Sequence, residues 1–153
     1  MATYMFFELE QILHTNPGDA GYDTARVTDL LIELLRRRPE AQGLRDAVIG
    51  MLEATHATGT IPPEQIEDML LDLARSTTDA HVRANALVIW VILRAHRGTE
   101  RHCNLALKAA VTDDPTHTMA GLILQGYQMG KLTEVTALVI EGARQSYRDI
   151  FDH

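Results

Sequence analysis

The stretch that most constrains the fold runs from Ala84 to Ala95, where ten of twelve side chains are apolar. Only Asn85 and Arg94 interrupt it. A helix that is apolar on every face has to be covered on most sides, either by other helices or by lipid. A bilayer span needs about 20 apolar residues, and the cations Arg94 and Arg97 end this run too early. The stretch therefore predicts the central buried helix of a globular domain.

The composition indicates one domain with an acidic surface. A chain of 153 residues with 46% hydrophobic content can bury one substantial core, so we expect a single domain over residues 1–153. Its net charge of −7 makes nucleic acid and anionic membranes poor partners, because proteins bind both of them through an excess of Lys and Arg. The single cysteine, Cys103, cannot close an internal disulfide, and the chain does not open with a signal-peptide pattern. We therefore expect a cytoplasmic protein.

Apolar residues recur at helical spacing before the central stretch. Residues 1–23 are expected to form an N-terminal helix and a turn-rich loop. After this loop, three sets of apolar residues fall at positions i, i+3, i+4, i+7 and i+8, which is one face of a helix. These sets are Val27, Leu30, Leu31, Leu34 and Leu35; Leu44, Ala47, Val48, Met51 and Leu52; and Ile66, Met69, Leu70, Leu73 and Ala74.

Three further helices are expected after the central stretch. Gly98 ends the central helix, and Asp114 with Pro115 is expected to begin a later one as cap and first helical residue. No segment alternates with a period of two over a useful length. The sequence therefore predicts an all-α protein of about eight helices in antiparallel helical hairpins. The apolar faces of the last three helices are Cys103, Ala106, Leu107, Ala110 and Val111; Met119, Leu122, Ile123 and Tyr127; and Leu132, Val135, Leu138, Val139 and Ala143.

One helix pair resembles a divergent tetratricopeptide repeat. Gly98, Ala110 and Pro115 stand where this repeat of about 34 residues carries its small turn residue, its later alanine and its closing proline. Trp90 lies three residues beyond the usual tryptophan position, and Arg94 replaces the usual tyrosine. The resemblance implies a tetratricopeptide-like, α-solenoid-like bundle.

A second resemblance covers roughly residues 63–135. An apolar helix, a glycine turn, an Asn-x-Ala-Leu-type helix and an Asp-Pro pair follow one another here as residues 84–95, Gly98, residues 103–107 and residues 114–115. This order is similar to the C-terminal part of an uncharacterised actinobacterial domain family. The resemblance implies no known activity.

Metal and cofactor sites are not predicted. Glu53 and His56 have the Glu-x-x-His spacing of di-iron bundles, but that site needs two such motifs and the chain has one. Because Glu53 lies off its apolar stripe, we expect an exposed helix end there. Four other histidines stand alone in polar surroundings and are expected at the surface: His14, His81, His117 and His153.

The clearest patch of basic side chains surrounds the turn after the central helix. We call the residues Arg94, His96, Arg97, Arg101 and His102 the basic turn. Its cations can receive an acidic peptide, a carboxylate or a phosphate through charge-assisted hydrogen bonds. Ordinary solvation of a structural turn is the alternative. The two histidines and the adjacent cysteine do not supply the four ligands that zinc requires.

No sequence motif indicates catalysis. The chain lacks a Gly-rich phosphate loop, a nucleophile elbow, a His-Glu-x-x-His motif and a Cys-x-x-Cys pair, so we do not expect an enzyme. Two functions remain: a non-catalytic protein–protein interaction or adaptor module, and a regulatory protein that contacts nucleic acid or a nucleoprotein complex through the basic turn. Apolar residues beyond one helix face, including Ile32, Ile49 and Leu71, favour a homodimer.

Overall fold

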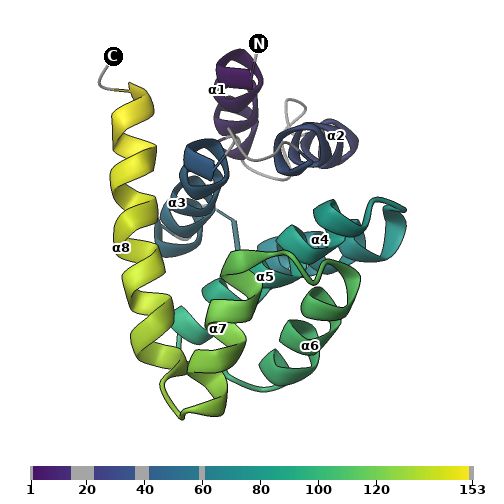
Figure 1. Ribbon diagram of the computed structural model, residues 1–153. Coiled ribbons are helices and arrows are strands. Elements are labelled where there is room, and N and C mark those ends of the chain that lie inside the picture. Colours follow the sequence, from purple (N-terminus) through teal and green to yellow (C-terminus); the bar gives the residue numbers. More distant parts are fainter. Residues whose placement is uncertain (1, 15–22, 37–41, 59–60, 152–153) are drawn as a thin grey trace. The chain divides into compact units, whose positions relative to one another are not determined.

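The computed structural model describes residues 2–14, 23–36, 42–58 and 61–151, so almost all of the loop expected before Asp23 lies outside the described residues. The described residues form eight helices and no strand, which confirms the all-α class (Figure 1). In chain order the helices are α1 (Ala2–Leu13), α2 (Thr24–Leu35), α3 (Gln42–Thr58), α4 (Pro63–Ser76), α5 (Ala80–His96), α6 (Cys103–Asp113), α7 (Thr118–Gln128) and α8 (Leu132–Phe151). None of them is long and apolar enough to cross a membrane.

The chain divides by its internal contacts into two compact units. Unit 1 comprises Met1–Met69 and Gly142–His153, and unit 2 comprises Leu70–Glu141. Helices α1, α2 and α3 belong to unit 1, and α5, α6 and α7 belong to unit 2. Helices α4 and α8 contribute residues to both units. The single domain over residues 1–153 stays a prediction.

Unit 1 is built from the buried faces of α1, α2 and α3, and α1 contacts both of the other two. All five predicted core residues of α2 are buried. The part of α8 that belongs to this unit packs closely against α3, because Gly50 of α3 has no side chain. A Cβ at Gly50 would meet the carbonyl of Ala143 and lie 2.8 Å from the Cβ of Tyr147. The Tyr147 ring also packs against Phe6, with ring centroids 6.1 Å apart.

Unit 2 is organised around α5, as the apolar run predicts. Eleven of its side chains are buried, including that of Trp90, and Leu87 is half-buried. The carboxylate of Asp79 caps the helix by accepting from the backbone N–H groups of His81 and Val82. Helices α5, α6 and α7 contact one another pairwise. The central position of the apolar run is therefore confirmed.

The buried face of α7 differs from the predicted one. The helix buries Ala120, Ile123 and Gly126 and leaves 54% of Leu122 exposed. Gly126 lies close to α8, because a Cβ at this position would be 2.7 Å from Cγ2 of Val135. The two helices therefore approach closely at Gly126, whereas Leu122, one helical turn earlier, remains exposed.

The predicted face of α8 is displaced in a similar way. Thr136 and Ile140 are buried, whereas 69% of Leu138 is exposed. The Thr136 hydroxyl donates to the carbonyl of Leu132 at 2.9 Å. Since this bond satisfies the hydroxyl within the helix, threonine can occupy a buried position that the apolar pattern left off the core face.

Two glycine substitutions in α7 test this packing. Gly126→Ala should lower the free energy of unfolding by about 1–2 kcal/mol, because overpacking costs more than the gain in helix propensity. Gly121→Ala is the matched control: Gly121 is exposed, and an added Cβ meets nothing within 4 Å. Within a single chain it should raise the free energy of unfolding by about 1 kcal/mol. Urea denaturation measures both, and a Gly126→Ala variant as stable as the wild type would contradict the close contact.

Candidate interaction site and buried polar network

The basic turn occupies the end of α5 and the connection to α6, within unit 2. His96, Arg97, Arg101 and His102 are exposed, and Arg94 is half-buried. The predicted site residues therefore lie on one short segment, with four of the five side chains at the surface.

Arg94 supports the turn from within. Its guanidinium carbon lies 4.7 Å from the ring centroid of Trp90, and Nη2 donates to the carbonyl of Arg101 at 3.4 Å. A cation over an indole face gains about 0.5–1 kcal/mol at a partly exposed site. These contacts connect the last turn of α5 to the segment that precedes α6. Arg94 thus contributes to the shape of the turn.

His102 is strained in the conformation that it adopts. Its φ of 68° is the only positive φ of a non-glycine residue in the described part of the chain, and the left-handed region costs roughly 1–2 kcal/mol for such a residue. His102 is the N-cap of α6 but makes no side-chain capping bond. The positive end of the α6 dipole therefore adds to the charge of the exposed cations around it.

The basic turn carries a net positive charge. Glu100 is the one acidic residue between positions 94 and 102, against three arginines. Its carboxylate accepts from the Thr133 hydroxyl at 3.2 Å, a contact with the first turn of α8. This segment is basic on a chain whose net charge is −7.

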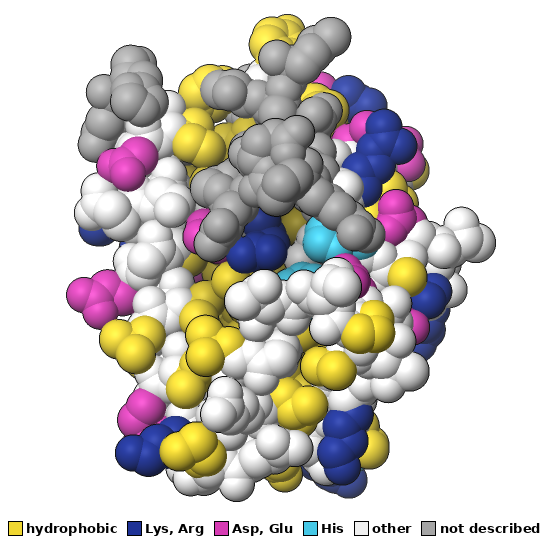
Figure 2. All heavy atoms as spheres, in the orientation of Figure 1, with side chains coloured by type: hydrophobic (Ala, Val, Ile, Leu, Met, Phe, Trp, Pro, Cys, Tyr) yellow, Lys and Arg dark blue, Asp and Glu magenta, His cyan; other side chains and the backbone are white. Residues whose placement is uncertain are grey.

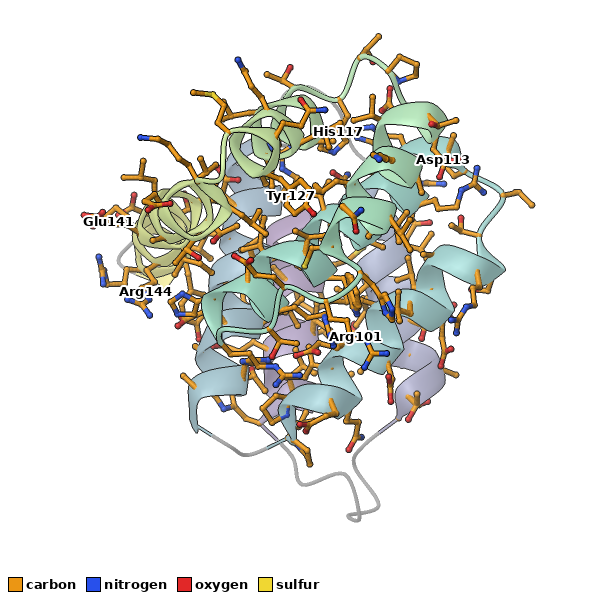
Figure 3. All side chains as sticks on the ribbon, turned by 90° about the horizontal axis from the view of Figure 1, so that it is seen from below. Arg101, Asp113, His117, Tyr127, Glu141 and Arg144 are labelled. Carbon is orange, nitrogen blue, oxygen red and sulfur yellow. The ribbon has the colours of Figure 1, made fainter. Side chains whose placement is uncertain are left out.

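A buried polar network lies at the other end of the hairpin that α5 and α6 form. Figure 3 shows Asp113 and Arg101 at opposite ends of α6, with His117 on the Asp113 side. The network consists of four side chains from α5 and from the segment between α6 and α7. Oδ2 of Asp114 lies 2.7 Å from Nδ1 of His81, Nδ2 of Asn85 lies 3.2 Å from Nε2 of His81, and Oδ1 of Asn85 lies 2.5 Å from Nε2 of His117.

The first helical turn of α7 fixes the direction of these hydrogen bonds. Nδ1 of His117 accepts from the backbone N–H of Ala120 at 3.1 Å, so Nε2 carries the proton and donates to the Asn85 oxygen. The Asn85 amide nitrogen can then donate to Nε2 of His81, which leaves the Nδ1–H of His81 to donate to Asp114. A continuous line of hydrogen bonds thus connects the N-cap of α7 to Asp114 through α5.

Asp114 receives several hydrogen bonds at the end of this line. The hydrogen bond from His81 is the largest cause that lowers the pKa of Asp114 from 3.8 to about 2; burial opposes it, and the hydroxyl and backbone N–H of Thr116 reinforce it. The expected capping role was wrong: Asp114 ends α6, and α7 begins at Thr118 after the N-cap His117. Pro115, which we expected to be the first helical residue, instead forms a turn with Thr116 between the two helices.

The expected surface positions of two histidines were also wrong. His117 is buried, and the His81 side chain is only 11% exposed. The sequence could not place them because Asp114 is 33 residues from His81, and Asn85 is 32 residues from His117. The one available signal was Asn85, an amide within an apolar run, which needs polar partners once it is buried.

Glu53 and His56 of unit 1 are buried, which corrects the exposed helix end predicted for them. The Glu53 carboxylate accepts from Arg144 at 3.1 and 2.5 Å, and Nε2 of His56 lies 3.0 Å from Oε2 of Glu67. Glu53 and His56 therefore make polar contacts with two different partners, Arg144 and Glu67. Within the part of the chain that the structure describes, no group of three or more His, Cys, Asp or Glu side chains could hold a metal ion.

Asn85→Ala tests the polar network. The variant removes one bond from each imidazole, and a buried polar group that loses its partner costs about 1–3 kcal/mol. We expect the free energy of unfolding to fall by an amount in this range. Nitrogen chemical shifts of the wild-type imidazoles should identify the Nε2–H tautomer for His117 and the Nδ1–H tautomer for His81. The opposite tautomer in either ring would contradict the assigned directions.

Asp114→Asn tests the electrostatics of the same network. The pKa of Asp114 is lower in the folded protein, about 2, than its ordinary 3.8. Its contribution to stability is therefore fully present above pH 3.8 and is lost as the pH falls toward 2. The contribution is up to about 2 kcal/mol. In Asp114→Asn the stability difference from wild type should shrink over this window, as measured by urea denaturation at each pH; a constant difference would reject the assignment.

Comparison with known proteins identifies one family. A family model described as "Domain of unknown function (DUF4192)" matches residues 9–131, a region that includes the basic turn and the polar network. No curated protein and no solved structure matches the chain. The match agrees with the expected resemblance to an uncharacterised family, and it covers 123 of the 153 residues. The chain belongs to the DUF4192 family.

Proposed function

We propose that this chain is a non-catalytic protein-binding module that recognises an acidic segment of another protein through the basic turn. The observation that carries the proposal is the strained, exposed His102 in a turn of positive charge on an acidic chain. Strained backbone persists where the surrounding structure imposes it, and it clusters at functional sites. No hydrogen bond of the His102 side chain accounts for this conformation as a helix cap.

The chemistry of the turn suits carboxylates. Arg97 and Arg101 present planar guanidinium groups, which bind carboxylates through paired, charge-assisted hydrogen bonds. The N-terminus of α6 favours negative charge at the same place. Arg94 acts as a positioning residue, because its guanidinium already lies over Trp90.

The charge of the rest of the chain supports selectivity for this surface. An acidic segment is repelled by a molecule with net charge −7 and attracted by the basic turn. Such complementarity directs encounter and orientation more than it adds affinity. The same net charge disfavours nucleic acid, whose binding needs several cations along its backbone.

We further propose that α5 and α6 form a divergent tetratricopeptide-like unit and that the protein acts in the cytoplasm. Gly98, with φ of 87°, and buried Ala110 support the first proposal, because the repeat uses small residues at its turn and between its helices. The single buried cysteine, Cys103, is compatible with the second.

The double charge reversal Arg97→Glu/Arg101→Glu tests the binding site. Fluorescence anisotropy with a labelled decaglutamate peptide should show binding to the wild type that weakens at least ten-fold in the variant. The thermal midpoint should stay within a few degrees, because exposed charges contribute at most about 1 kcal/mol each. The control Arg75→Glu/Lys131→Glu makes the same change of net charge at two other exposed positions of unit 2 and should retain most of the binding.

Three results would overturn this proposal. The first is equal affinity of the wild type and the Arg97→Glu/Arg101→Glu variant for the peptide, and the second is no peptide binding by the wild type at low salt. The third is tight binding of a labelled DNA duplex that weakens steeply with salt and disappears in the same variant. That third result would favour a nucleic-acid contact in place of the acidic protein segment.

A further inference from the structure

Unit 2 also carries exposed apolar side chains outside the basic turn. Leu105 of α6, Leu122 of α7, Met129 just after α7 and Leu138 of α8 each expose more than half of their surface. Figure 2 shows hydrophobic side chains spread over α6, α7 and the adjacent part of α8 on one face of the molecule. We call these four residues, with the outward side of α7, the α7 face.

Charge is missing from the centre of this surface. Helix α7 contains no Asp, Glu, Lys or Arg between Thr118 and Gln128, although 23% of the whole chain is charged. Its exposed side includes Leu122, Gln125 and Gln128. An exposed helix side normally carries charged residues, whereas the centre of a protein interface is depleted of them.

Gly121 is an unfavourable residue for the stability of α7. It is exposed in the interior of α7, where glycine costs about 1 kcal/mol relative to alanine. Packing within the chain explains Gly126 but not Gly121, because a Cβ at position 121 meets nothing within 4 Å. A glycine on an exposed face permits the close approach of another backbone.

We propose that the α7 face joins two copies of this chain into a two-fold dimer, in which the two α7 helices pack against each other. This inference goes beyond the acidic-segment binding proposed above and does not depend on it. A two-fold interface brings one surface against itself, so a second copy can bind only if that surface is self-complementary.

The α7 face meets this requirement. Leucine and methionine side chains pack against their own kind, and the amides of Gln125 and Gln128 both donate and accept, so each can pair with its copy. No charge of α7 opposes the same charge across the axis. Elsewhere two chains of net charge −7 repel each other, so the uncharged helix is where they can approach at least electrostatic cost. An acidic or basic partner would find no complementary charge on α7.

A dimer interface needs more surface than α7 alone provides. A stable interface buries about 800 Å² on each partner, whereas a helix of 11 residues is only about 16 Å long. Helix α7 is therefore too small by itself. The exposed side chains of Leu105 on α6 and Leu138 on α8 add apolar surface to that of α7.

Leu122→Glu tests the interface. Light scattering at high protein concentration should give the wild type twice the chain mass of 17.0 kDa, and the variant should dimerise at least ten-fold more weakly, because two carboxylates would face each other in an apolar contact. Circular dichroism should show unchanged helix content, since Leu122 is exposed. Tyr4→Glu makes the same type of change at an exposed aromatic residue of α1 in unit 1 and should leave the dimer intact.

A charge-swap experiment identifies the two-fold contact directly. Leu122→Lys should also be monomeric, and mixing it with Leu122→Glu should restore a dimer with one copy of each. A monomeric wild type, a Leu122→Glu dimer as tight as wild type, or a mixture that stays monomeric would each overturn the inference. Peptide binding reports separately on the basic turn: Leu122→Glu should still bind decaglutamate, and Arg97→Glu/Arg101→Glu should still dimerise.

Discussion

The burial of α5 on every side is the constraint on which the architecture of unit 2 depends. Enclosing an apolar helix also encloses Asn85, and a buried amide without partners costs about 1–3 kcal/mol. His81 and His117 provide those partners, and Asp114 satisfies His81 in turn. The hydrophobic burial of one helix therefore determines polar contacts in the segment between α6 and α7, where His117 also caps α7.

Arg94, the second polar residue of the apolar run, is only partly buried. Arg94 lies near the end of α5, where its guanidinium covers Trp90 and reaches the carbonyl of Arg101. The polar groups of Asn85 are thus satisfied by internal hydrogen bonds, whereas the charge of Arg94 is accommodated by partial exposure at the basic turn. The two interruptions of one apolar helix give the hairpin a buried, hydrogen-bonded end and a charged, exposed end.

The two proposed surfaces of unit 2 differ in the physics of recognition. The basic turn offers charge, which gives orientation and a dependence on salt; the α7 face offers uncharged apolar area, which responds little to salt. A dimer through the α7 face would carry two basic turns. A partner with two acidic segments of suitable spacing would then bind more tightly than either segment alone, because the second contact becomes intramolecular.

The sequence by itself determined the helices, the burial of α5 and the position of the basic turn, because helical periodicity, glycine at a helix end and clustered charge are local properties. The apolar pattern of α2 was confirmed at every position. Only the tertiary structure decided that Leu122 and Leu138 face solvent, because the sides of α7 and α8 that are buried depend on how these helices pack against the others, as Gly126 does against Val135. It also decided that His81 and His117 are buried, since their partners lie more than 30 residues away and meet them only when the helices pack.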